Sequence, residues 1–290
     1  MNRLPSWIRV QAPGSAEYLK TRALMEKLSL HTVCQEARCP NIGECWDHKS
    51  ATFMILGDVC TRACGFCHVS KGKPGAVDLN EPENLAQAVK SLDMQHVVIT
   101  SVDRDDLPDG GAGHFAKIVR RIKELTPHVR IEVLTPDFRG NREALKTVVE
   151  SPISVFNHNL ETVPRLYKIA RRGSIYERSL NVLKWAKEIN PNFYTKSGLM
   201  LGLGETIDEV FAVLKDMRGI GCDILTLGQY LRPSLDQLPV ERFVTPEEFK
   251  TLGEEARQLG FKHVESGPLV RSSYHAWEHA DSAEKESFLR

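Results

Sequence analysis

The sequence has no long apolar run and no excess of charge of either sign. Nowhere do about 18 consecutive apolar residues occur, the length that a membrane-spanning helix requires, and residues 1–13 hold no apolar signal-peptide core. Lysine plus arginine (38) equal aspartate plus glutamate (38), so no net field attracts nucleic acid or an anionic membrane. These absences predict a cytoplasmic protein with neither nucleic acid nor membrane as a partner.

The chain also lacks internal repeats, low-complexity segments and an even number of cysteines. Its 290 residues, 41% of them hydrophobic, suffice for one large folded domain or two smaller ones. Seven cysteines in a reducing compartment argue against a disulfide framework. Six of them lie between Cys34 and Cys67, which predicts that the chemistry is concentrated there. The remaining one, Cys222, is interpreted as a small buried apolar residue.

From residue 52 onward, short apolar or β-branched runs alternate with longer amphipathic ones. This alternation predicts βα units and a parallel sheet. Six units are too few for a closed eight-stranded barrel, so we predict an α/β fold, a partial (βα)6 TIM-like barrel. The predicted strands are Phe53–Leu56, Val97–Thr100, Ile131–Leu134, Ser154–Asn157, Gly198–Leu201 and Ile224–Gly228. The predicted helices are Glu83–Leu92, His114–Leu125, Asn141–Val149, Ile175–Ile189, Thr206–Arg218 and Thr245–Leu259.

Three parts of the chain are predicted to form one catalytic unit. Residues 1–50 are an N-terminal helical and cysteine-motif extension, residues 51–265 the barrel, and residues 266–290 a C-terminal extension that caps it. Helical periodicity predicts a helix over Ala16–Leu30, with one apolar side made of Leu19, Leu24, Met25 and Leu28.

A C-x3-C-x2-C loop, in DVCTRACGFCHV, directly follows the first predicted strand. Cys60, Cys64 and Cys67 are spaced too tightly and unevenly for a zinc ribbon, although a zinc knuckle or a reduced thiol cluster is an alternative. Three thiolates can hold a [4Fe–4S] cluster and leave its fourth iron open to S-adenosylmethionine (SAM), for one-electron cleavage to a carbon radical. The loop resembles that of the radical SAM superfamily, which implies that Phe66 packs near the adenine.

A second triplet precedes this loop, in VCQEARCPNIGECW. Cys34, Cys39 and Cys45 have C-x4-C-x5-C spacing, which fits a second cluster. The same three thiolates with His48 would also complete a tetrahedral zinc site. The spacing alone leaves both interpretations open.

The two triplets are followed by ITSVDRDDLPDGGA, FNHNLETVPRLY, KSGLMLGLGET, LGQYLRPS and GPLVRSSYHA. With these motifs, roughly residues 30–278 resemble the lipoyl synthase family. The resemblance implies a radical SAM sulfurtransferase that inserts sulfur at C6 and C8 of a protein-bound octanoyl-lysine to give the dihydrolipoyl cofactor. It also implies two [4Fe–4S] clusters and two SAM molecules per product, with the auxiliary cluster as sulfur donor.

The same resemblance assigns residues to the auxiliary cluster. Cys34, Cys39 and Cys45 hold it, and a serine of the motif Arg271–Tyr274 is its fourth ligand. We place that ligand on Ser273, with Ser272 as second choice. A serine oxygen suits iron–sulfur chemistry less well than a thiolate, so it leaves readily when the cluster is dismantled.

Polar residues after the predicted strands are candidates for binding SAM. Thr100, Ser101 and Asp103 follow the second strand in an acid-rich loop with Asp105 and Asp106, where Mg²⁺ or Ca²⁺ binding is the alternative. The remaining candidates are Glu132, Asn157 and Asn159 for the ribose or carboxylate of SAM, and Lys196 for its carboxylate. His158 is interpreted as structural, because hydrogen abstraction by a radical needs no base.

The partners implied by the resemblance are octanoylated lipoyl carrier domains of 2-oxoacid dehydrogenase or glycine cleavage proteins, an electron donor such as flavodoxin or ferredoxin, and an iron–sulfur carrier protein. Lys168, Arg171 and Arg172 are either a contact for an acidic carrier domain or a solvated helix face. Two rival functions are a radical SAM enzyme of another reaction and a non-enzymatic metal-binding or redox-sensing protein.

Overall fold

The computed structural model describes residues 4–48, 50–274 and 276. Its main feature is a curved sheet of eight strands in the order β1-β2-β5-β6-β7-β8-β9-β10. All neighbours from β2 to β10 are parallel, and β1 is antiparallel to β2. The strands are β1 (His31–Thr32), β2 (Thr52–Ile55), β5 (His96–Ser101), β6 (Arg130–Leu134), β7 (Val155–Asn157), β8 (Tyr194–Leu201), β9 (Ile224–Gln229) and β10 (His263–Gly267).

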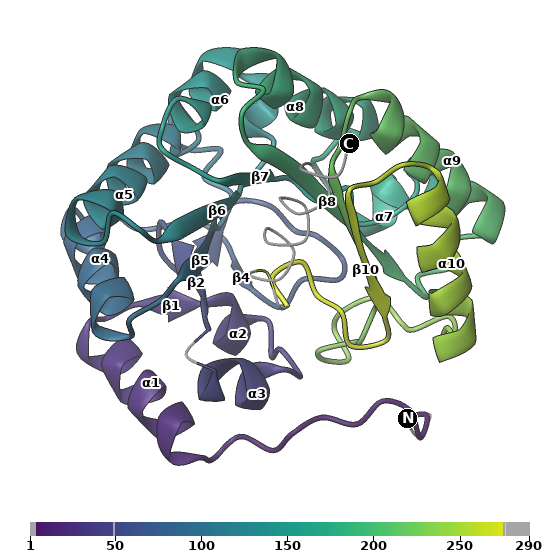
Figure 1. The fold of residues 1–290 in the computed structure, drawn as a ribbon, viewed down its shortest axis with the longest axis horizontal. Coiled ribbons are helices and arrows are strands. Elements are labelled where there is room, and N and C mark those ends of the chain that lie inside the picture. Colours follow the sequence, from purple (N-terminus) through teal and green to yellow (C-terminus); the bar gives the residue numbers. More distant parts are fainter. Residues whose placement is uncertain (1–3, 49, 275, 277–290) are drawn as a thin grey trace.

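Helices cover the outer face of this sheet (Figure 1). Their apolar stripes pack on the strands, and strands such as β9, with all six residues buried, are covered on both faces. The helices after β2 are α4 (Glu81–Ser91), α5 (Ala112–Leu125), α6 (Arg142–Val149), α7 (Tyr167–Ala170), α8 (Tyr176–Ile189), α9 (Ile207–Gly219) and α10 (Pro246–Gln258), with 3₁₀ turns at Phe138–Gly140 and Pro164–Leu166.

The six predicted strand–helix units are confirmed, and the fold is the predicted partial barrel. The prediction missed β10, which pairs with β9 through His263–Gly267. This edge strand has a single apolar side chain, Val264, and only that residue is buried. Strand β8 begins at Tyr194, four residues before its predicted start, because Lys196 made a buried stretch look polar.

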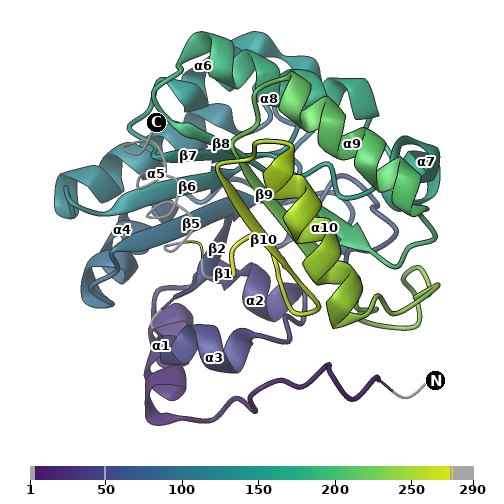
Figure 2. The same cartoon turned by 45° about the vertical axis from the view of Figure 1, so that its right-hand side comes forward.

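The N-terminal extension gathers at one side of the molecule, beside the edge strand β1 (Figures 1 and 2). It comprises α1 (Ala16–Lys27), α2 (Val33–Glu36) and α3 (Ile42–Asp47). The predicted apolar side of α1 is partly wrong, since Leu19 is 54% exposed and Thr21 and Met25 are the buried residues. The ring of Tyr18 instead stacks on Trp46 of α3, with centroids 5.1 Å apart.

The segment after β10 crosses back to this extension. The Asn41 side chain donates to the Leu269 carbonyl (2.8 Å), and the Tyr274 hydroxyl lies 3.1 Å from the Glu44 carboxylate. The C-terminal segment therefore joins the last strand to residues at the front of the chain. Residues 275 and 277–290 of the predicted C-terminal part lie outside the described residues. In the part of the chain that is described, no helix has the length and apolarity needed to cross a membrane.

Candidate active site

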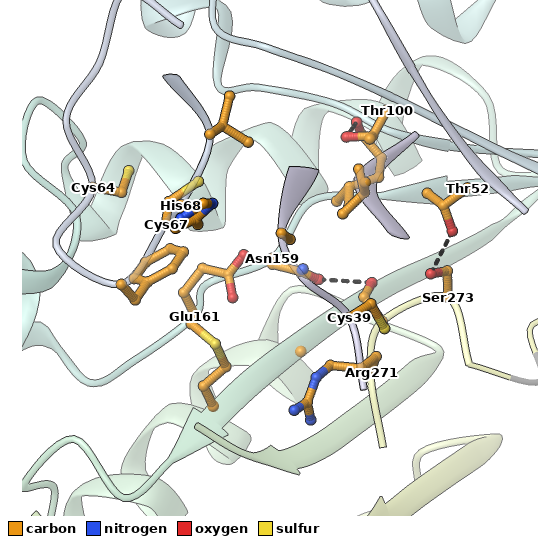
Figure 3. A pocket seen from close by; sticks show the side chains of 18 of the residues that line it. Cys39, Thr52, Cys64, Cys67, His68, Thr100, Asn159, Glu161, Arg271 and Ser273 are labelled. Carbon is orange, nitrogen blue, oxygen red and sulfur yellow. Dashed lines mark hydrogen bonds between the residues drawn. The ribbon is translucent and has the colours of Figure 1, made fainter. Parts of the chain in front are cut away.

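A cavity of about 490 Å³ opens at the carboxyl ends of the strands, as expected for this kind of sheet. Five of the six clustered cysteines line it, namely Cys34, Cys39, Cys60, Cys64 and Cys67. Figure 3 shows Cys64 and Cys67 on one side of the cavity and Cys39 and Ser273 on the other. The structure thus brings both triplets to one shared space.

The loop with Cys60, Cys64 and Cys67 is fixed by backbone contacts on both sides. Its first residues form β3 (Val59–Cys60), which pairs in parallel with β4 (Ser70–Lys71). The Gly65 amide donates to the Ala170 carbonyl and its carbonyl accepts from the Leu238 amide, both at 2.9 Å. A Cβ at Gly65 would lie 2.6 Å from the Ile169 carbonyl oxygen, so only glycine fits between these segments.

Arg62, inside the C-x3-C spacing, anchors the loop to the barrel. Its buried guanidinium lies 2.7 Å from Asp137, 2.8 Å from Asp105 and 3.3 Å from Asp103. Asp106 pairs with Arg104 at 2.8 Å. The acid-rich loop is therefore neutralised by arginines, which accounts for its charge without Mg²⁺ or Ca²⁺. The sequence prediction missed Arg62, because its partners lie 41 or more positions away.

Cys34 is buried and the other five clustered thiols are half-buried, and the loss of surrounding water raises the pKa of each. The pKa of Cys34 and of Cys64 is raised to about 12, and that of Cys60 to about 11. Neighbouring thiols within each triplet add to the effect, as Cys39 does for Cys34 and Cys67 does for Cys64. Thiols that are grouped but protonated need a cationic centre to become ligands, and a bound iron–sulfur cluster supplies one. The donor set fits such a cluster.

The zinc alternative for the first triplet receives no support from this geometry. His48 is exposed, and among the residues that the structure describes no three His, Cys, Asp or Glu side chains converge closely enough to hold one metal ion. A single zinc needs all its ligands about 2.0–2.3 Å from one point. The thiolates of a cubane bind different irons and stand farther apart.

The motif Arg271–Tyr274 lies beside the first triplet (Figure 3). The Thr52 hydroxyl donates to the Ser273 hydroxyl at 2.6 Å, and the Thr52 backbone in turn hydrogen-bonds Cys34. Ser272 is held elsewhere, accepting from Asn157 at 2.7 Å and donating to Asn159 at 3.2 Å. Ser273 is therefore linked to Cys34 through a single residue, Thr52. Ser272 instead fixes the segment to the barrel.

The predicted SAM residues separate into two groups. Phe66, Thr100, Ser101, Asp103 and Asn159 line the cavity. Of the others, Lys196 is fully buried and its ammonium lies 3.0 Å from Glu132, which also accepts from Asn157 at 2.8 Å. Lys196 therefore has a carboxylate partner within the protein, and this buried pair replaces the predicted contact with the SAM carboxylate.

The interpretation of Arg171 as part of a surface basic cluster is wrong. Its side chain is buried and donates to the Asn159 carbonyl and to the hydroxyls of Tyr167 and Ser179. Arg171 also lines the cavity, as do Glu161 and Arg271, which the sequence analysis did not single out as ligand contacts. Nothing in the sequence separates Arg171 from the exposed Arg172 beside it.

The surroundings of His158 and Cys222 fit the interpretation of both as structural residues. His158 is buried with Nδ1 2.8 Å from the Thr135 carbonyl, and burial lowers its pKa to about 4. Its ring is therefore neutral near pH 7. Cys222 is buried, and its Sγ lies 3.5 Å from the Ile224 carbonyl.

Comparison with known proteins extends these observations to the whole chain. Residues 54–217 match the Radical SAM superfamily, and residues 1–39 match the N-terminal domain of lipoyl synthase of that family. A lipoyl synthase of Nitrosococcus oceani is 58% identical over 275 residues, which cover 94% of this chain and 85% of the relative. One of Rubrobacter xylanophilus is 54% identical, covering 97% and 88%.

Solved structures share the fold at much lower sequence identity. The FeFe-hydrogenase maturase HydG from Carboxydothermus hydrogenoformans is 14% identical with a TM-score of 0.57, covering 92% of this chain and 70% of its own. Methylornithine synthase is 16% identical with a TM-score of 0.57, covering 73% of this chain and 63% of its own. These likenesses concern the fold alone.

Proposed function

Because the chain belongs to the lipoyl synthase family of radical SAM enzymes, we propose that its cavity is where an octanoyl chain on a carrier protein receives sulfur. The activity is that of a radical SAM sulfurtransferase, which inserts sulfur at C6 and C8 of a protein-bound octanoyl group. The observation that carries the proposal is the shared cavity, with thiols of both triplets at its walls.

The chain offers ligands for two [4Fe–4S] clusters. Cys60, Cys64 and Cys67 hold one, and Cys34, Cys39, Cys45 and Ser273 hold the auxiliary cluster. When bound, the first cluster and SAM supply a carbon radical that removes hydrogen, and the auxiliary cluster supplies sulfur. The position of the two triplets on opposite sides of the cavity supports this division, because the substrate carbon then reaches both.

The remaining residues position and shield the reactants. Arg62 and its aspartates hold the Cys60–Cys67 loop at the cavity wall. Phe66, Thr100, Ser101, Asp103 and Asn159 are proposed contacts for SAM. The apolar side chains of Met54, Leu134, Leu199 and Met200 also line the cavity and suit an alkyl chain from which water is excluded.

Mass spectrometry of an octanoyl-lysyl peptide tests the function directly. The reconstituted protein is incubated without oxygen with the peptide, SAM and a strong chemical reductant. We expect the peptide to gain two sulfur atoms and two SAM molecules to be cleaved per product. Cleavage of SAM with an unchanged peptide would contradict the assignment of the octanoyl substrate. A colourless preparation that binds zinc would contradict the clusters themselves.

The proposed protein partners are an octanoylated lipoyl carrier domain of a 2-oxoacid dehydrogenase or glycine cleavage protein, a reductant such as flavodoxin or ferredoxin, and an iron–sulfur carrier protein. The cytoplasmic location stays a prediction. Three exposed cations from separate segments, Arg38, Lys71 and Arg232, line the cavity mouth, and among the described residues none of them forms an ion pair. We call these three residues the cationic rim and propose that carboxylates of the carrier domain dock on it.

Charge reversal of the cationic rim should weaken binding of the carrier but not of a short peptide. The triple variant Arg38→Glu, Lys71→Glu, Arg232→Glu should raise KM for an octanoylated carrier domain about tenfold, because like charges then face each other. KM for a neutral octanoyl-lysyl peptide should change less than about twofold. A chemical reductant drives both reactions, so docking of a protein electron donor does not enter.

The matched control reverses three exposed lysines on the outer helices, Lys117, Lys215 and Lys250. It changes the net charge equally but should leave both KM values near those of the wild type. Equal KM increases in the two triple variants would mean that overall charge, rather than the rim, governs carrier binding.

A further inference from the structure

Besides Arg38 and Arg232 of the cationic rim, two further arginines that line the cavity lack a carboxylate in ion-pair contact. Arg171 and Arg271 both line the cavity, and among the described residues neither forms an ion pair. The hydrogen bonds of Arg171 go to a carbonyl and two hydroxyls, and that of Arg271 goes to the Val270 carbonyl at 2.7 Å. Arg62, by contrast, has three carboxylates around it.

A buried cation without a counter-ion is costly, because burial removes its hydration. Arg171 is buried and Arg271 is half-buried, so both guanidinium groups have lost part of their contact with water. Glu161 also lines the cavity, but among the described residues it forms no ion pair with Arg171. Both arginines therefore occupy places that favour an additional negative charge in the cavity.

Each arginine stands beside a different triplet. The carbonyl of Ala170, which directly precedes Arg171, accepts at 2.9 Å from the amide of Gly65, which directly follows Cys64. Figure 3 shows Arg271 next to Cys39, on the side of the cavity opposite Cys64. The thiols become anionic thiolates when they bind a cluster, so the missing negative charges appear where the two arginines lie.

We propose that Arg171 and Arg271 are the counter-cations of the two clusters and that each sets the reduction potential of the cluster beside it. The proposal rests on the proposed function, since it requires clusters at both triplets. Potentials of iron–sulfur clusters depend on local charge, hydrogen bonding and exposure. A neighbouring cation stabilises the reduced, more negative state, so its removal lowers the potential.

The test replaces each arginine with methionine, which keeps an apolar stem but removes the charge. Potentials are measured by spectroscopic redox titration, without SAM, in two backgrounds that each lack one triplet through cysteine-to-alanine changes. We expect Arg271→Met to disfavour reduction of the auxiliary cluster at least tenfold, equal to about 59 mV for one electron. The equilibrium constant for reduction of the other cluster should change less than about twofold. Arg171→Met should give the reverse pattern.

A charge-retaining variant separates charge from shape. Arg271→Lys should leave the equilibrium constant for reduction of the auxiliary cluster within about twofold of the wild-type value. Arg171→Lys should do the same for the other cluster. The proposal is overturned if the lysine and methionine variants behave alike, if both clusters shift together, or if Arg171→Met changes SAM affinity without changing a potential. If the wild type binds no iron, the proposed function fails instead.

Thermal unfolding of the cluster-free protein gives a readout that does not depend on cluster assembly. Without a cluster, the charge of Arg271 is uncompensated, so Arg271→Met should leave Tm unchanged or raise it. With clusters bound, the same substitution should lower Tm relative to the wild type. A lower Tm of Arg271→Met in both forms would mean that the arginine stabilises the fold itself and would overturn the proposal.

Discussion

Replacing Cys39 with alanine should abolish sulfur insertion while SAM is still cleaved. Cys39 lines the cavity on the side of Ser273, away from the Cys60–Cys67 loop. Its loss removes a ligand of the auxiliary cluster but leaves the three thiols of the other cluster in place. We expect sulfur-containing product to fall by more than about a hundredfold, because the loss of an outer-shell partner of a metal site already costs about 10–100-fold and Cys39 is proposed as a direct ligand. Product is measured by mass spectrometry and SAM cleavage by chromatography of its nucleoside product.

Two further cysteine variants complete this experiment. Cys64→Ala should lose both SAM cleavage and sulfur insertion, because it disables the first cluster. Cys222→Ala should keep both, since this thiol is buried against the backbone of neighbouring strands and lies outside the cavity lining. Insertion of both sulfur atoms by Cys39→Ala at the wild-type level would show that the sulfur comes from elsewhere.

Replacing Gly228 with alanine should dislodge the C-terminal segment and with it the auxiliary cluster. A Cβ at this position of β9 would lie 2.0 Å from the Val270 carbonyl oxygen and 3.0 Å from its carbon. Backbone atoms cannot rotate away as a flexible side chain does, so residues 268–274 must move. Overpacking of this kind costs about 1–3 kcal/mol. Because Ser273 belongs to the displaced segment, we expect the iron content to fall by about half.

Gly219→Ala is the matched control for this variant. Gly219 ends α9, is exposed, and a Cβ there meets nothing within 4 Å. Its iron content and Tm should equal those of the wild type or exceed them slightly, since alanine favours a helix over glycine. If Gly228→Ala retained its full iron content, the Val270–Tyr274 segment would not be needed to hold the auxiliary cluster.

The parts of the fold that could be predicted are those with a local sequence signal. The strand at Val97–Thr100 is a run of apolar and β-branched residues, and its helix begins near the predicted place. Strand β10 was missed because an edge strand buries little and therefore needs few apolar residues. The β8 prediction began late because Lys196 is polar by type but buried in a pair with Glu132.

The site shows the same division between local and distant signals. Cysteine spacing is visible because the three cysteines of each triplet lie close together in the chain. The partners of Arg62 come from loops after β5 and β6, and no spacing rule links Arg62 to Asp137. Arg171 and Arg172 are adjacent in sequence, yet only the tertiary structure decides which one is buried.

The hydrogen bond from Thr52 to Ser273 joins residues 221 positions apart, and that from Tyr274 to Glu44 joins residues 230 apart. A ribosome that adds about 5–20 residues per second needs on the order of 10–40 s to synthesise the intervening chain. During that time Cys34, Cys39 and Cys45 have left the ribosome, while their partner segment does not yet exist. Assembly of the proposed auxiliary site is therefore an event of the finished polypeptide, and until then its three thiols wait without the segment that completes their surroundings.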